Sequence, residues 1–195
     1  MSFRPICSGW AASCISVPYM PAVAAPYLAA ALLLVVAGLA KTRDPLSLVR
    51  ALRAAGLRVR APLLSRFVRV AAAAEALLGF VAICRPGGLV ALAVAASYAG
   101  FTAFVIRAMR TGSPLASCGC FGKADTPPTG THAVVTAVLA VIALLAATQP
   151  AGLLPELLVH QPWAGLPLLV VTAVLGYLTY LSLALLPLLS RRAAR

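Results

Sequence analysis

Two cysteines separated by one glycine are the residues of this chain whose type and spacing best suit chemistry. They are Cys118 and Cys120, in the stretch 117–122 with the sequence SCGCFG. Two thiols this close in the chain can form an intramolecular disulfide, and the small ring predicts a strained, easily reduced bond. Closing so short a loop adds little stability. The spacing of the two cysteines therefore favours a role in electron exchange over a role as a structural disulfide.

Two other interpretations compete with redox exchange. The cysteines are alternatively half of a metal site, or inert small residues in a tight turn. A zinc site needs four ligands, and the only histidines, His132 and His160, lie at opposite ends of one predicted helix. We therefore expect no metal. Cys84 is expected to be a small lipid-facing residue or a resolving thiol, and Cys7 and Cys14 could pair in an oxidising compartment.

Glu75 is the second candidate for chemistry, because it lies inside a hydrophobic segment. A carboxylate within a membrane span is costly and usually faces protein rather than lipid. Arg69 is one possible partner of Glu75, but the two residues do not lie well on the same face of a helix. A basic residue of another helix is the alternative partner. The sequence leaves a proton-handling role and a structural hydrogen bond equally open.

A polar-aromatic patch is expected in the next hydrophobic segment, where a quinone headgroup could stack. Its members are Tyr98, Phe101, Thr102 and Phe104. Aromatic packing between helices is the commoner explanation of such a patch, and quinone is the single cofactor that the sequence suggests. Gly79 and Gly100 would permit close approach of neighbouring helices.

The elements that must position these side chains are long apolar segments. Of the 195 residues, 62% are hydrophobic and 10% are charged, whereas soluble domains carry about 25% charged residues. Segments of about 20 apolar residues cross a bilayer as helices, because lipid offers the backbone no hydrogen bonds. The sequence predicts an all-α, polytopic membrane helical bundle of five spans, at Ala22–Ala40, Val68–Cys84, Gly88–Ile106, Thr131–Thr148 and Trp163–Leu189.

The chain divides into three parts around these spans. Residues 1–21 are an N-terminal extension that lacks the features of a secretory signal. Residues 22–148 form the main membrane domain, which includes the loop 107–130 with the two cysteines. Residues 149–195 add a loop, the fifth span and a basic tail.

A short amphipathic helix is expected after the first span, at residues 46–60. On a helical projection, Leu48, Val49 and Leu52 share one side, and arginines share the other. This pattern is typical of a helix that lies in the headgroup layer. An ordinary basic loop is the alternative.

Basic residues gather on one predicted side of the membrane. Eight lie within residues 41–69: Lys41, Arg43, Arg50, Arg53, Arg58, Arg60, Arg66 and Arg69. The loop 107–130 and the C-terminal tail add six more. Because basic loops stay in the cytoplasm, we expect the N-terminus outside and the C-terminus inside a bacterial inner membrane. The net charge of +12 indicates anionic membrane lipid as a partner rather than nucleic acid.

Three stretches together resemble the methylamine utilisation protein MauE family, a relative of the DoxX-like membrane proteins. They are residues 41–45 (KTRDP), residues 75–79 (EALLG) and the run from Phe101 to the motif 118–122 (CGCFG). The resemblance covers roughly residues 22–148. It implies a DoxX-like four-helix core plus one further helix.

The resemblance also implies a function. The family looks like a maturation factor that works with a thioredoxin-like partner in forming disulfides of the small subunit of methylamine dehydrogenase. Cys118 and Cys120 would be the redox-active pair, and Glu75 matches the family's intramembrane carboxylate. The chain would then be a thiol–disulfide oxidoreductase component. A non-catalytic assembly scaffold and a quinone-linked subunit of the DoxX type are the alternatives.

Overall fold

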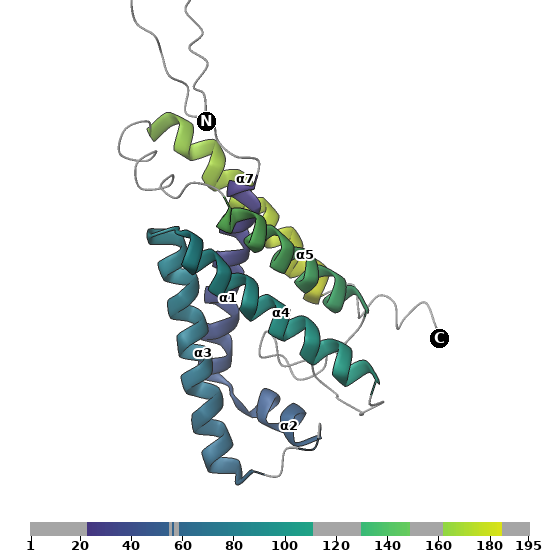
Figure 1. The fold of residues 1–195 in the computed structure, drawn as a ribbon. Helices are drawn as coiled ribbons and strands as arrows, with labels where there is room; N and C mark the ends of the chain where they lie inside the picture. The colour runs from purple at the N-terminus through teal and green to yellow at the C-terminus, as the bar shows by residue number, and fades with distance from the viewer. Residues whose placement is uncertain (1–22, 55, 57–58, 111–129, 149–161, 185–195) are drawn as a thin grey trace, which may run out of the picture.

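The computed structural model describes residues 23–54, 56, 59–110, 130–148 and 162–184, and the regular structure within these ranges is helical (Figure 1). The helices run in the order α1 (Ala24–Arg43), α2 (Leu46–Ala54), α3 (Ala61–Cys84), α4 (Gly88–Arg110), α5 (Gly130–Ala147) and α7 (Pro162–Ala184). This arrangement confirms the all-α helical bundle.

Four helices are long and apolar enough to cross a membrane: α1, α3, α4 and α5. They correspond to the first four predicted spans, and the chain is a multi-pass membrane protein. The fifth predicted span is the helix α7, whose apolar part, Leu166–Ser182, is shorter. The last predicted residues of that span, 185–189, lie outside the described residues.

The second span begins well before the predicted start at Val68. Helix α3 starts at Ala61 with a proline in its first turn, where a missing backbone N–H costs nothing. The charged side chains of Arg66 and Arg69 in these first turns are exposed. The apolar pattern placed the start of this helix too late in the chain, because its first turns carry charged residues.

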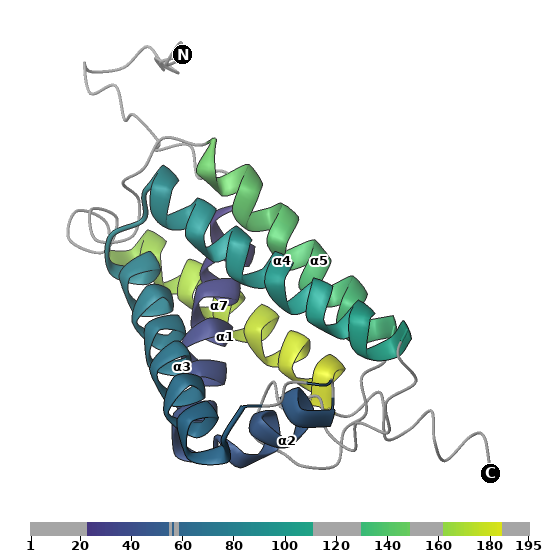
Figure 2. The ribbon, with the colours of Figure 1, turned by 60° about the horizontal axis from the view of Figure 1, so that its bottom comes forward.

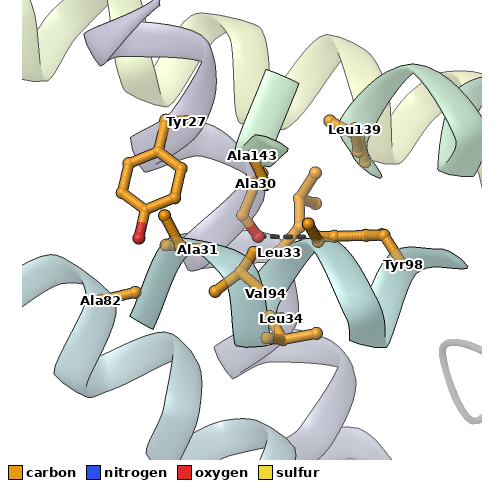
Figure 3. Close-up of a cluster of buried hydrophobic side chains, with 12 residues drawn as sticks. Tyr27, Ala30, Ala31, Leu33, Leu34, Ala82, Val94, Tyr98, Leu139 and Ala143 are labelled. Atoms are coloured by element: carbon orange, nitrogen blue, oxygen red, sulfur yellow. Dashed lines mark hydrogen bonds between the residues drawn. The ribbon is translucent and has the colours of Figure 1, made fainter. Parts of the chain in front are cut away.

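Helix α1 lies at the centre of the bundle, with α3, α4, α5 and α7 around it (Figures 1 and 2). In α1, 56% of the apolar window is buried, against 22% in each of α3, α4 and α5. The principal core cluster is built around the first half of α1 and includes Ala30, Leu34, Val94 and Ala143 (Figure 3). The outer helices therefore offer their large apolar side chains to lipid.

Glycine brings α1 and α3 into close contact. A Cβ atom on Gly79 would lie 2.6 Å from the carbonyl oxygen of Ala31, and one on Gly38 would lie 2.6 Å from that of Ala72. Each helix thus has a glycine at the place where the backbone of the other helix lies against it. The expected close approach at Gly79 is confirmed. The one expected at Gly100 is wrong, because nothing lies within 4 Å of a Cβ placed there.

The short helix α2 packs against the end of the bundle rather than offering its apolar side to lipid. Val49 joins Leu64 and Val68 of α3 in one buried cluster, and Ala51 joins Ala108 of α4 in another. The helix ends at Ala54 and not at residue 60, because Gly56 takes a backbone φ of 97° that ends helical geometry.

Candidate functional site

A buried ion pair joins the two helices that the glycines bring together. The Lys41 ammonium, in the last turn of α1, lies 2.6 Å from Oε2 of Glu75 on α3. The Lys41 side chain is 3% exposed and that of Glu75 is 21% exposed. Of the two partners considered for Glu75, a basic residue of another helix is the one observed. Arg69 instead lies exposed, because six residues along a helix put two side chains on different faces.

The position of this pair follows from local packing. Lys41 would ordinarily extend into the headgroup layer at the end of a span. Here Gly38, one turn earlier in α1, sits against Ala72 and Ala76 of α3. Glu75 belongs to that same turn of α3, and Lys41 reaches it from the last turn of α1. A buried ion pair is worth little by itself, but removing one partner leaves a buried charge and costs about 3–5 kcal/mol.

An aromatic ring from α4 completes the surroundings of the ammonium. The Lys41 Nζ atom lies 4.2 Å from the centroid of the Phe101 ring, within the range of a cation–π contact. The Tyr98 ring meets Phe101 edge to face, with centroids 5.9 Å apart. The Tyr98 hydroxyl donates a hydrogen bond to the Ala30 carbonyl oxygen at 2.7 Å (Figure 3), which fixes the aromatic pair against α1.

Hydroxyl groups extend this arrangement to α5. The Thr102 hydroxyl lies 2.8 Å from the Thr136 hydroxyl, which donates to the His132 carbonyl oxygen at 2.8 Å. The His132 side chain is 3% exposed. We call the set Lys41, Glu75, Tyr98, Phe101, Thr102, His132 and Thr136 the polar layer; it crosses α1, α3, α4 and α5.

A small cavity lies beside the polar layer. Its volume is about 30 Å³ and it is lined by Leu33, Leu34, Ala37, Lys41, Tyr98, Phe101, Val105, His132, Thr136 and Leu139. This is room for about one or two water molecules. Glu75 is not among the lining residues, so Lys41 stands between the carboxylate and the cavity.

The residues of the predicted aromatic patch lie in two different parts of the structure. Tyr98 and Phe101 line the cavity, and Thr102 faces Thr136. Phe104 packs beside Ala51 and Ala108 instead, because six residues turn it about 120° away from Tyr98 on the helix. Quinone stays a prediction.

Three residues of the polar layer escaped sequence reasoning. The sequence indicated Lys41 only as a basic residue at the end of a span. It indicated His132 only as a candidate metal ligand, for a metal site that we do not expect, and it gave no signal for Thr136. One signal was available for Lys41. An intramembrane carboxylate requires a cation, and Lys41 stands within the segment 41–45 whose resemblance to the family was noted.

The cysteine pair lies outside the described residues, in the segment 111–129. That segment leaves α4 at Arg110 and enters α5 at Gly130, and α4 and α5 are joined through Thr102 and Thr136. Cys7 and Cys14 also lie outside the described residues. Cys84 is an exposed, free thiol at the end of α3.

Apolar spanning helices around a buried ion pair define a polytopic helical membrane protein with a polar layer in its core. The sequence model of the methylamine utilisation protein MauE family matches residues 19–149. The chain belongs to this family and is thereby linked to methylamine utilisation. No curated protein and no solved structure matches it.

Proposed function

We propose that the protein is a membrane thiol–disulfide factor that supports maturation of a partner protein. Cys118 and Cys120 cycle between a disulfide and a dithiol, and a thioredoxin-like protein is the exchange partner. The observation that carries the proposal is the Cys-Gly-Cys spacing in a chain of the MauE family. Methylamine dehydrogenase, whose small subunit contains the disulfides to be formed, is the maturation target that the family implies.

The exchange needs no cofactor. A thiolate of the target attacks the Cys118–Cys120 disulfide, a mixed disulfide forms, and the second target thiolate releases it. The target gains a disulfide, and Cys118 and Cys120 receive two electrons and two protons as a dithiol. The disulfide of the thioredoxin-like partner accepts these electrons and protons in a second exchange.

The bundle supports this proposal by tying down both ends of the cysteine-bearing segment. Helix α4 is fixed to α2 through Ala108 and Ala51 and to α5 through Thr102 and Thr136.

The orientation is part of the proposal. The exposed arginines of α2, of the first turns of α3 and of the last turn of α4 lie at one end of the bundle, where α2 contacts both neighbours. By the positive-inside rule, we expect this end in the cytoplasm. Cys118 and Cys120 follow α4 and would face the same side. Direct exchange with a target outside the cytoplasm requires the opposite side, because disulfides form and persist in oxidising compartments, and thiol labelling distinguishes the two orientations.

Thiol labelling tests both the redox role and the orientation. A membrane-impermeant maleimide is applied to intact cells and to opened membranes, with and without reduction, using a variant that lacks the other three cysteines. We expect labelling only after both reduction and opening. Labelling of intact cells after reduction alone would reverse the orientation and leave the redox role standing.

A functional assay of the same cysteines separates this proposal from an assembly scaffold. Cys118→Ser and Cys120→Ser should each abolish maturation of the partner while the protein still accumulates in the membrane. The matched control is Cys84→Ser, which changes an exposed thiol on α3 and should leave maturation intact. A pair that tolerates serine at both positions would favour the scaffold.

A further inference from the structure

Helix α3 lies on the outside of the bundle (Figures 1 and 2), and two arginines stand on its lipid-facing side. Arg66 and Arg69 are one helical turn apart, and both are exposed. Eleven residues after each of them come Leu77 and Phe80, which are exposed apolar side chains within the span. Because eleven residues make close to three helical turns, each arginine leaves the helix in nearly the same direction as one of these two side chains. The arginines therefore face the surrounding lipid.

Large apolar side chains lie beside the two arginines on the same face. Leu63, Phe67 and Val70 are 60%, 68% and 69% exposed. Leu63 is nearer to the start of α3 than either arginine, and so nearer to the basic end of the bundle. A leucine exposed at that level is stable in contact with the lipid interface and costs free energy in water. The arginines therefore lie within the membrane interface and not beyond it.

The apolar part of α3 is too short to hold both of its ends clear of the bilayer. It lies between the exposed residues Arg69 and Arg85, whose separation of 16 residues corresponds to about 24 Å of helix rise. The hydrocarbon core of a bilayer is about 30 Å thick. Either the arginine side chains extend to the edge of the core, or the bilayer thins and brings its phosphates to them. In both cases the guanidinium group meets a lipid phosphate.

Among the described residues, the chain offers these two arginines no anion. Glu75 is paired with Lys41, and the Asp44 carboxylate accepts a hydrogen bond from the Leu46 backbone N–H. The other two acidic residues of the chain lie outside the described residues. Two cations one turn apart on a helix repel each other. A phosphate between them removes this repulsion, and the planar guanidinium group binds phosphate through paired hydrogen bonds.

The helix surface next to the arginines suits an acyl chain. Ala73 is exposed one turn after Arg69, and it leaves the helix in a direction between those of the two arginines. Its small side chain lets a neighbouring chain approach the helix backbone closely. Leu77 and Phe80 then offer apolar contact deeper in the membrane. A lipid chain that begins at a phosphate beside the arginines therefore runs over alanine toward these two residues.

We propose that Arg66 and Arg69 form a binding site for one anionic phospholipid. Its phosphate lies between the two guanidinium groups, and its acyl chains pass over Ala73 toward Leu77 and Phe80. A negatively charged headgroup is favoured over a zwitterionic one, because no described side chain neutralises the two positive charges. The site depends on the geometry of α3 alone and is independent of the cysteine chemistry.

Native mass spectrometry of the full-length protein tests the site. The protein is released from detergent micelles to which phosphatidylglycerol or phosphatidylcholine with identical acyl chains has been added at equal concentration. We expect the protein to retain one phosphatidylglycerol several-fold more often than one phosphatidylcholine. Equal retention of the two lipids by the unaltered protein would overturn the proposal, and this comparison requires no variant to fold.

Two charge-matched variants locate the bound lipid. Arg66→Gln/Arg69→Gln should remove the preference for phosphatidylglycerol. Arg50→Gln/Arg53→Gln is the matched control, because it removes two exposed arginines with the same spacing from α2 and should leave the preference unchanged. Circular dichroism checks that both variants keep their helical content. Equal losses of preference in the two variants would mean that net charge alone attracts the lipid, and the proposed site would be wrong.

Glycerol phosphate distinguishes a lipid from a free phosphate as the ligand. Added at the same concentration as the lipid, it should leave phosphatidylglycerol bound, because it has no acyl chains to contribute to the binding energy. If glycerol phosphate displaces the lipid under these conditions, the site recognises a free phosphate and the lipid assignment fails.

Discussion

The two ends of this bundle are held together by different means. Toward the start of α1, the core is a tight apolar cluster in which alanines such as Ala30, Ala31 and Ala143 are fully buried. Toward the end of α1, the polar layer joins four helices through an ion pair, a ring contact and hydroxyl groups. The helices pack closely at both ends, but charged side chains are buried only in the polar layer, where their burial costs free energy. The polar layer is therefore the part of the core whose packing depends on paired charge.

Lys41→Met should give the largest effect. It leaves Glu75 without its cation and should lower the free energy of unfolding by about 3–5 kcal/mol, measured by denaturation in micelles. Arg69→Met is the matched control, because that side chain is exposed, and it should change stability by less than about 0.5 kcal/mol.

The double variant Lys41→Met/Glu75→Leu sharpens the same comparison. It removes both charges at once, and we expect it to recover most of the stability that Lys41→Met loses. A double variant as unstable as the single one would show that the ammonium contributes through packing alone, and the contrast between the two ends would vanish.

Gly79→Ala should come next in size. Its Cβ would lie 2.6 Å from a backbone oxygen of α1, so the two helices must separate, at a cost of about 1–3 kcal/mol. The control is Gly100→Ala, which meets no atom within 4 Å and should be neutral or stabilising by up to about 1 kcal/mol. Equal losses at the two positions would argue against the close α1–α3 packing.

The two buried tyrosines give the smallest and most specific difference. Tyr98→Phe removes the hydrogen bond to Ala30 and should cost about 0.5–1.5 kcal/mol. The Tyr27 hydroxyl is buried without a partner among the described residues, so Tyr27→Phe should be neutral or stabilising. Thermal unfolding of the two variants side by side measures the difference, and the reverse order would contradict the assigned bonding.

The sequence was informative about helices and less so about partners. Apolar runs located the spanning helices because lipid enforces helical structure on them. The start of α3 was misplaced because charged residues in its first turns break the apolar pattern. The residue opposite Glu75 depends on how α1 and α3 cross at Gly38 and Gly79. No periodicity within one helix encodes that crossing, although Gly79 itself was identified.

The same limit applies to the aromatic residues of α4. Their spacing was visible, but which of them meets the cavity depends on how α4 is turned about its axis against its neighbours. Phe104 packs beside Ala51 of α2 and Ala108, and Phe101 lies beside Lys41. The prediction that residues 46–60 lie in the headgroup layer treated that segment alone and missed its contacts with two helices.

The contacts of α2 also constrain the order of events during biogenesis. This helix leaves the ribosome directly after α1, yet its apolar side is completed by Leu64 and Val68 of α3 and by Ala108 of α4. Those residues are synthesised later and become available only after the α3–α4 hairpin has entered the membrane. We therefore expect docking of α2 to be a late step of folding. In a nascent chain that stalls before α4, this helix would lack its contact with Ala108.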